Sequence, residues 1–372
     1  MLRKLWIPTS QAQLLQAQER LLSHHHLTTL YKRKRVKLPS TLSKTLCGTD
    51  QLTINAIEYQ SSKPKPNPST CILAHGLGAG LGLFYTNLTH LSQRFDRVIA
   101  IDWLGFGGSS RPKWNSTTDN VNTSQSTDFF IDSLHEFLQQ MNVTECAMIG
   151  HSLGGLLATE YAMKYPKTIQ GLYLISPAGL PKPNSDLIPV NETQDVSMTL
   201  QLLDSAWQNN VTPGAIVRAM GPKGPENVQK TIQRRFNNRW NPNETEMISN
   251  YLYHITAAEP SGEYAMNGLL TPLIHPKSKK IGLYARRPLV NRMSRCISKD
   301  LPIHVVYGDT DWLYSSAPSS TGVDKAIEQL KKEGMNKLSF ELIPNAGHHI
   351  YLDNSIALHQ SIDQFIDRYN LN

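Results

Sequence analysis

The chain has 372 residues, of which 40% are hydrophobic and 18% are charged, and this balance excludes wholesale disorder. With 37 Lys and Arg against 30 Asp and Glu, the formal net charge is +7, which suits an anionic partner such as a nucleic acid or a phospholipid surface. The four cysteines form no Cys-x-x-Cys pair, which argues against a disulfide framework and against a cysteine zinc site. No apolar run approaches the roughly 20 residues that a membrane-spanning helix needs.

Residues 1–49 form a basic segment, in which nine Lys or Arg accompany a single acid, Glu19. Leucines recur at helical spacing over 14–22, and Ser10 is a suitable N-cap, so we expect an amphipathic helix there. Trp6 precedes it. Three interpretations stay open: attachment to an anionic membrane, packing on the protein surface, and mitochondrial targeting by an acid-poor leader.

Strand and helix patterns then alternate, beginning with a strand over 54–59. The further predicted elements are strands over 70–74, 98–102, 146–150 and 171–176, and helices over 127–141 and from 153. Strands that alternate with helices indicate an α/β fold with a mostly parallel sheet covered on both faces.

The pattern changes after Pro177 and returns to alternation near residue 300. The intervening segment has few strand signals and contains helical stretches such as 228–239, so we interpret it as a helical insertion. The elements expected after it are a strand over 303–307, a helix over 323–333, a strand over 337–343 and a helix over 356–369. The predicted organisation is the basic segment 1–49, a core of 50–180 and 300–372, and a helical cap of 181–299.

The strongest chemical signal is Gly150-His-Ser152-Leu-Gly154, between an apolar strand and a helix. Gly-x-Ser-x-Gly in this context places the serine on a sharp, strained turn, where small neighbours let strand and helix approach closely. The following helix directs its N-terminal N–H groups at any anion formed there. Ser152 is therefore the candidate nucleophile.

A serine hydroxyl needs a base that is itself oriented by an acid, and in this arrangement the chain order is Ser, acid, His. Asp311 and His348 each lie just after a predicted strand, at the edge where α/β sheets place their sites. We favour this pair. Asp309 competes for the role of acid and His349 for the role of base.

An oxyanion hole needs two backbone donors. The residue after the nucleophile, Leu153, supplies one, and Leu77 in His75-Gly-Leu-Gly supplies the other, because the glycines permit a tight turn. This glycine loop is not interpreted as a dinucleotide fingerprint, since it lacks the acidic ribose partner. The stretch from Asp102 to Ser109 is expected to shape a loop beside the site.

Two further patterns leave alternatives open. His348 and Asp353 match the His-x-x-x-x-Asp spacing of glycerolipid acyltransferases, although Asp353 is more simply a residue that caps or orients the last helix. The pairs Arg234–Arg235 and Arg286–Arg287 are candidates for contacts with phosphate oxygens, or are ordinary solvated surface.

These motifs together resemble the α/β-hydrolase superfamily. Within it, the sequence is similar to the group that contains cardiolipin-specific deacylases, N-acyl phospholipid lipases and the lipase co-activator of animal lipid droplets. The resemblance covers nearly the whole chain. Its most specific motifs lie in the insertion, at 213–224 and 261–266.

The resemblance implies a serine hydrolase that removes a fatty acyl chain from a cardiolipin-like phospholipid or a lysophospholipid. Because the co-activator branch has lost the elbow serine, Ser152 favours an active enzyme over a co-activator. The alternative activity is acyl transfer to lysophosphatidate. We expect no organic cofactor, no metal and no nucleic-acid partner. The expected location is a mitochondrial membrane, or else a lipid-droplet or endoplasmic-reticulum surface reached from the cytoplasm.

Overall fold

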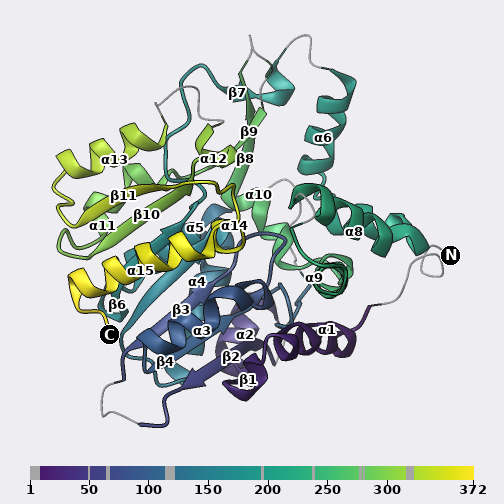
Figure 1. Ribbon diagram of the computed structural model, residues 1–372. Helices are drawn as coiled ribbons and strands as arrows, with labels where there is room; N and C mark the ends of the chain where they lie inside the picture. The colour runs from purple at the N-terminus through teal and green to yellow at the C-terminus, as the bar shows by residue number, and fades with distance from the viewer. Residues whose placement is uncertain are drawn as a thin grey trace.

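The computed structural model describes residues 9–48, 51–63, 68–113, 122–193, 197–236, 239–275, 279, 281–315 and 322–372. Figure 1 shows a central twisted sheet with helices on both faces and a second group of helices and short strands to one side of it. Trp6 and the other residues before Thr9 lie outside the described residues.

The described residues form an eight-stranded sheet in the order β1-β2-β4-β3-β5-β6-β10-β11. Pairing is antiparallel from β1 to β2 and from β2 to β4 and is parallel from there to β11. This confirms a mostly parallel sheet. The strands are β1 (Tyr31–Lys37), β2 (Thr53–Gln60), β3 (Thr70–Ala74), β4 (Arg97–Ile101), β5 (Cys146–His151), β6 (Ile169–Ile175), β10 (Ile303–Gly308) and β11 (Leu338–Ile343).

Alternating apolar side chains divide the core into two layers, one on each face of the sheet. In β4, Val98 and Ala100 join one layer while Ile99 and Ile101 join the other, as the two-residue period of a strand requires. The helices of the first layer include α3 (Tyr85–Arg94), α14 (Ile350–Asp353) and α15 (Ser355–Tyr369). Those of the second include α4 (Thr123–Gln140), α5 (Leu153–Lys164), α11 (Met293–Cys296) and α13 (Val323–Lys332).

The predicted amphipathic helix is present as α1 (Gln11–His24), and Ser10 caps it by accepting a hydrogen bond from the Gln13 amide. Its leucines face inward: Leu14, Leu21 and Leu22 are each at most 2% exposed. Figure 1 places α1 beside α9 (Pro242–Ala257), and the two helices are in contact. Of the three interpretations, the structure shows packing, because these leucines are covered by the protein.

The basic run that follows α1 is not a free segment. It forms β1, the edge strand of the sheet, so the sheet begins at Tyr31 and not near residue 50 as expected. Tyr31 is buried, and Lys34 pairs with Glu58 of β2 at 3.0 Å. An edge strand that carries Lys and Arg is protected from pairing with other chains, which explains why a strand has this unusual composition. The helix α2 (Ser40–Cys47) connects β1 to β2.

The insertion contains helices, as predicted, and also a three-stranded sheet that was not predicted. The helices are α6 (Met198–Gln208), α7 (Pro213–Ala219), α8 (Gly224–Arg235), α9 and α10 (Met266–Leu269). The strands are β7 (Ile188–Pro189), β8 (Leu270–Ile274) and β9 (Ile281–Ala285), in the order β7-β8-β9. The strand β8 is difficult to predict from the sequence because it contains Pro272, and proline lacks the N–H donor that strand pairing uses. On the side that faces β7, only Leu273 and Ile274 are paired, so Pro272 needs no partner there.

The described part of the chain contains no helix that is both long enough and apolar enough to cross a bilayer.

Replacing Leu21 by Ala tests whether α1 is an integral part of the folded protein. Leu21 is fully buried, so the change should lower the free energy of unfolding by about 2–5 kcal/mol, because it removes buried apolar surface and leaves a cavity. Equilibrium urea unfolding followed by circular dichroism measures this. The matched control is Leu30→Ala, which alters a side chain that is 42% exposed and should cost well under about 1 kcal/mol. Equal effects of the two changes would contradict the docking of α1.

Candidate active site

Ser152 lies on a sharp turn between β5 and α5. Its backbone has φ 54° and ψ −116°, a left-handed conformation that costs a non-glycine residue on the order of 1–3 kcal/mol. The turn needs a glycine at position 154, because a Cβ there would overlap the Ala74 carbonyl. The predicted strand, turn and helix are therefore present, and the strain directs the Ser152 side chain away from the sheet.

The structure brings Ser152, His348 and Asp311 together. His348 Nε2 is 3.0 Å from Ser152 Oγ, and His348 Nδ1 is 3.1 and 3.2 Å from the two Asp311 carboxylate oxygens. A carboxylate only accepts hydrogen bonds, so Nδ1 carries the proton and Nε2 is free to accept from the serine hydroxyl. Asp311 is fully buried and also accepts from the Leu313 amide at 2.8 Å. The arrangement can transfer the serine proton to the imidazole.

The other candidate acid and the Asp353 carboxylate hold the loop that carries His348. Asp309 accepts hydrogen bonds from the amides of Asn345 and Ala346 at 3.0 and 3.1 Å, and these bonds lower its pKa. Asp353 accepts from the Gly347 amide at 3.0 Å. Neither carboxylate bonds to the His348 ring in the described structure. The cap of the last helix is the neighbouring residue Asn354, which corrects the expectation for Asp353.

Three more histidines surround this site, and burial lowers the pKa of each. His151 donates from Nε2 to the His348 carbonyl at 2.9 Å. Its pKa lies well below the usual value, mainly because the ring is buried and secondly because His348 is close to it. Burial lowers the pKa of His75. The nearby negative charge of Asp102 opposes this shift without cancelling it. His349, the competing base, accepts at Nδ1 from Arg235 at 3.1 Å, and burial is the main cause of its strongly lowered pKa. His349 is therefore a neutral neighbour and does not contact Ser152.

The two predicted oxyanion donors both lie beside the serine. Leu77 and Leu153 line the same pocket as Ser152, and within the described residues neither amide donates to another backbone group. The loop that carries Leu77 passes so close to the elbow that a Cβ on Gly76 would lie 2.9 Å from the Ser152 Cβ. This close approach is the reason why position 76 is a glycine. It leaves the amides of Leu77 and Leu153 available near the Ser152 hydroxyl.

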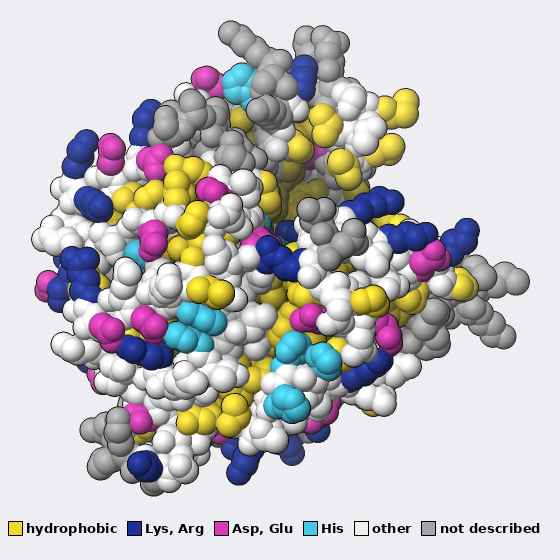
Figure 2. Space-filling model, in the orientation of Figure 1, with side chains coloured by type: hydrophobic (Ala, Val, Ile, Leu, Met, Phe, Trp, Pro, Cys, Tyr) yellow, Lys and Arg dark blue, Asp and Glu magenta, His cyan; other side chains and the backbone are white. Residues whose placement is uncertain are grey.

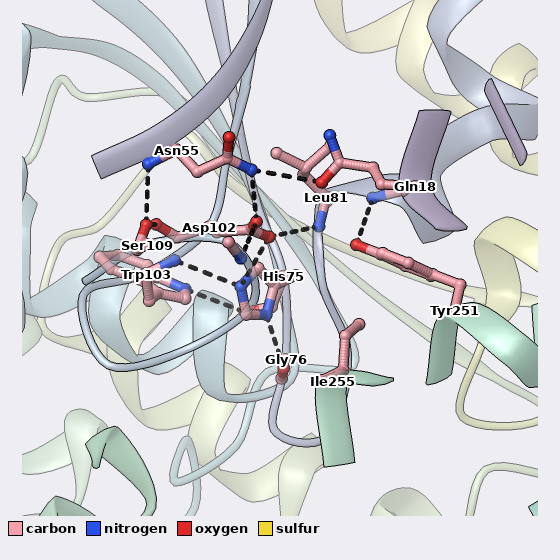
Figure 3. Close-up of polar contacts among 12 residues, drawn as sticks. Gln18, Asn55, His75, Gly76, Leu81, Asp102, Trp103, Ser109, Tyr251 and Ile255 are labelled. Atoms are coloured by element: carbon pink, nitrogen blue, oxygen red, sulfur yellow. Dashed lines mark hydrogen bonds and ion pairs between the residues drawn. The ribbon is translucent and has the colours of Figure 1, made fainter. Parts of the chain in front are cut away.

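A buried polar cluster fixes this loop (Figure 3). The Asp102 carboxylate is fully buried and accepts three hydrogen bonds at 2.8 Å, from the Asn55 side chain and from the amides of Leu81 and Gly108. His75 donates to the Gly76 carbonyl at 2.8 Å, and its own carbonyl accepts from the Trp103 indole at 2.9 Å. The stretch after Asp102 therefore shapes the loops beside the site, as its sequence suggested.

Sequence reasoning missed one member of this cluster, Tyr251 of α9. It is fully buried, and its hydroxyl accepts from the Gly82 amide at 3.1 Å (Figure 3). The available signal was the spacing of Ile248, Tyr251 and Ile255, which marks one buried helical face. Through Tyr251, the insertion touches the loop that carries Leu77.

The serine opens into a pocket of about 460 Å³ between the sheet and the insertion. Much of its wall is formed by Val217 of α7, Met220 just after α7, Ile232 of α8, and Ile248 and Leu252 of α9. We call this cavity the Ser152 pocket. Its size falls in the range of about 300–1,000 Å³ that is typical of small-molecule sites, and its apolar wall suits an acyl chain.

The structure separates the candidate arginines. All four arginines are exposed, and Arg235 lines the rim of the Ser152 pocket, whereas Arg234, Arg286 and Arg287 do not line it. The Arg286 guanidinium instead donates to the Asn267 carbonyl at 2.6 Å. The predicted phosphate contacts of Arg286 and Arg287 are therefore not part of this pocket; both residues follow the end of β9. The described residues contain no group of three or more His, Cys, Asp or Glu suited to a metal ion.

Comparison with known proteins identifies the class. The family described as "alpha/beta hydrolase fold" matches residues 71–355. The chain belongs to this family, and it has the helix-flanked, mostly parallel sheet of an α/β hydrolase with an insertion between β6 and β10.

Particular relatives and a solved structure extend this comparison. A probable 1-acylglycerol-3-phosphate O-acyltransferase of Oryza sativa subsp. japonica is 30% identical, over 96% of this chain and 81% of the relative. A (lyso)-N-acylphosphatidylethanolamine lipase of Homo sapiens is 31% identical, over 84% of each chain. The fold is similar to that of a crystal structure of a membrane phospholipase A, with a TM-score of 0.62 at 20% identity over 96% of this chain and 92% of that one.

The lowered pKa values of the histidines around the site predict how stability depends on pH. In the unfolded chain these histidines take up protons near the ordinary pKa of about 6.5, whereas the folded protein keeps His75, His151 and His349 neutral to lower pH. The unfolded state then binds more protons, so the free energy of unfolding should fall as the pH drops below about 6.5. Urea midpoints measured between about pH 8 and 5 should show this fall, and His349→Gln should make it less steep. A urea midpoint that does not change in this range would contradict the lowered pKa values of these three histidines.

Proposed function

We propose that the protein is a serine hydrolase that releases a fatty acid from an ester-linked acyl chain of a phospholipid. The observation that carries the proposal is the chain of contacts from Ser152 through His348 to Asp311 at the wall of the Ser152 pocket. The substrates we favour are a lysophospholipid or a cardiolipin-like phospholipid.

The geometry supports a two-step acyl transfer. Ser152 Oγ attacks the ester carbonyl while His348 Nε2 takes the serine proton and then gives it to the leaving alcohol. Asp311 holds the imidazole in the required tautomer and stabilises its positive charge without accepting the proton. The amides of Leu77 and Leu153 stabilise the oxyanion. A water molecule, activated by His348, then releases the fatty acid.

The lipid substrate is supported by the pocket and by the names of the relatives. The wall of the Ser152 pocket is mostly apolar, and relatives that align with most of this chain are named as lipases or acyltransferases of phospholipids. Hydrophobic burial of an acyl chain contributes roughly 0.8 kcal/mol per CH₂ group. A long-chain ester is therefore favoured over a short-chain ester at this site.

Acyl transfer to lysophosphatidate is the second candidate, and the relative of Oryza sativa subsp. japonica, named as a probable 1-acylglycerol-3-phosphate O-acyltransferase, favours it. The chemistry differs only in the acceptor, because a lipid hydroxyl replaces water in the second step. The placement of Asp353 argues against a catalytic pair of His348 and Asp353, because Asp353 bonds to the Gly347 amide while Asp311 bonds to the His348 ring. A non-catalytic co-activator is disfavoured by the intact contact between Ser152 and His348.

We further propose that the insertion rests on a phospholipid membrane surface. Exposed apolar side chains gather on α6 and α7, where Met198, Leu202 and Ile216 are 77%, 63% and 52% exposed. Figure 2 shows hydrophobic side chains over α6 above a hollow, and Lys and Arg side chains over α8 beside it. An apolar patch next to cationic side chains suits an anionic bilayer. The resemblance to deacylases favours a mitochondrial membrane.

Ser152→Ala tests the hydrolase. Fatty acid release from oleoyl-lysophosphatidylglycerol or cardiolipin should fall by roughly 10⁴-fold or more, because the nucleophile is lost. His348→Gln should be similarly inactive, and Ser185→Ala, which alters an exposed serine of the insertion, should retain wild-type activity. Lipid analysis of cells that express wild type or Ser152→Ala should then show the natural substrate accumulating.

Equal fatty acid release by the wild type and Ser152→Ala would contradict the proposed hydrolase. A product labelled from acyl-CoA and lysophosphatidate, made by wild type in the absence of net fatty acid release, would instead support the transferase.

The membrane contact is tested by sedimentation with vesicles that contain phosphatidylglycerol. The double change Leu202→Ser and Leu203→Ser should reduce the bound fraction by roughly tenfold or more, because each exposed leucine that enters the bilayer contributes about 1.5–3 kcal/mol. These side chains are 63% and 55% exposed, so the fold should be unaffected. Leu30→Ser, at a similarly exposed position away from α6, is the control. Unchanged binding of the double variant would rule out α6 as the docking surface.

A further inference from the structure

A polar line runs along the α8 wall of the Ser152 pocket. Asn227, Thr231 and Arg235 all line this pocket, and their spacing of four residues places them on one face of the helix. Val228 and Ile232 lie beside them on the same wall. The remaining wall is largely apolar, so this line marks the part of the cavity where a polar group of a ligand would be accommodated.

Arg235 is the only Lys, Arg, Asp or Glu among the described residues that line the pocket. No ion pair joins it to a carboxylate in the described structure. Asp353, which carries a carboxylate close to the His348 loop, accepts from the Gly347 amide and lies 3.7 Å from the Arg239 guanidinium instead. Arg235 therefore contributes a positive charge that the protein does not neutralise at this site.

The position of this charge is fixed relative to the reacting groups. Arg235 Nη2 donates to His349 Nδ1 at 3.1 Å, and the centroid of the His349 ring is 5.4 Å from that of His348. Burial keeps His349 neutral by lowering its pKa, so it accepts this bond without adding a competing charge. Only one of the five guanidinium N–H groups is used by His349. No other hydrogen bond of this guanidinium occurs among the described residues, so its remaining N–H groups can bind an anion beside His349, the neighbour of His348.

We propose that Arg235 is a specificity-determining residue that binds the phosphate of a net-anionic monoacyl glycerophospholipid while the acyl chain occupies the apolar part of the Ser152 pocket. This inference rests on the proposed function and names its substrate class. A planar guanidinium suits phosphate oxygens because it donates two parallel hydrogen bonds. No carboxylate lines the described pocket, so the ammonium group of a zwitterionic headgroup has no ion-pair partner there.

Arg234 is a matched control for Arg235. It is the preceding residue of the same helix, has the same side chain, and is exposed without lining the pocket. Arg234→Gln and Arg235→Gln therefore remove the same charge from nearly the same place in the sequence. Arg235→Lys keeps the charge and loses the two-pronged geometry.

The test uses equilibrium binding, which does not depend on turnover. The ligands are 1-O-octyl-glycerol 3-phosphate and the uncharged 1-O-octyl-glycerol, whose ether bonds cannot be cleaved and whose short chains keep them monomeric. Arg235→Gln should weaken binding of the phosphate ligand by roughly 10- to 100-fold, the value of a charge-assisted hydrogen bond. It should leave binding of the uncharged ligand unchanged. Arg235→Lys should be intermediate, and Arg234→Gln should bind both ligands like the wild type.

Three outcomes overturn the inference: equal weakening of both ligands by Arg235→Gln, unchanged phosphate binding in this variant, or the same loss in Arg234→Gln. Hydrolysis of octanoyl-lysophosphatidate, octanoyl-lysophosphatidylcholine and monooctanoylglycerol separates this failure from that of the proposed function. If wild type cleaves all three and Arg235→Gln does not change their order, the hydrolase stands and the role of Arg235 is wrong. If wild type cleaves none while the binding pattern holds, the phosphate site stands and the hydrolase is wrong.

Discussion

The strained turn at Ser152 is the constraint on which the site depends. Its left-handed backbone, with φ 54°, is tolerated because β5 and the first turns of α5 are buried and hold the turn from both sides. Two close approaches complete it: Gly154 lies against the end of β3, and Gly76 lies against Ser152 itself. One compact junction thus holds the hydroxyl and the two oxyanion amides together.

Two further sets of hydrogen bonds fix the partners of the serine. Asp309 and Asp353 hold the loop that presents His348, and Asp311 is the carboxylate that bonds to the His348 ring. On the opposite side, Asp102 fixes the loop that carries Leu77, and Tyr251 joins this loop to the insertion. These buried hydrogen bonds fix the loops on either side of Ser152, where fixed dipoles would need no reorganisation as charge develops.

The core was predictable from the sequence to within a few residues at most element ends. The strands over 70–74 and 303–308 and the helices over 153–164 and 355–369 have regular apolar patterns that local physics fixes. The insertion was less predictable. Its strand β8 contains a proline, and its helices bury side chains such as Tyr251 in contacts with distant segments. The strand β1 was hidden by its lysines and arginines, which an edge position tolerates.

The sequence by itself determined the class of chemistry, because Gly-x-Ser-x-Gly between a strand and a helix is a local pattern whose physical requirements lie within a few residues. It also narrowed the acid and the base to two candidates each. Only the tertiary structure shows that Asp311 bonds to the His348 ring and that His348 bonds to Ser152, since these contacts join residues that are 37 or more positions apart in the chain. The tertiary structure also distinguishes Arg234 from Arg235, which the sequence cannot separate because they are neighbouring arginines. Only Arg235 lies on the face of α8 that lines the pocket.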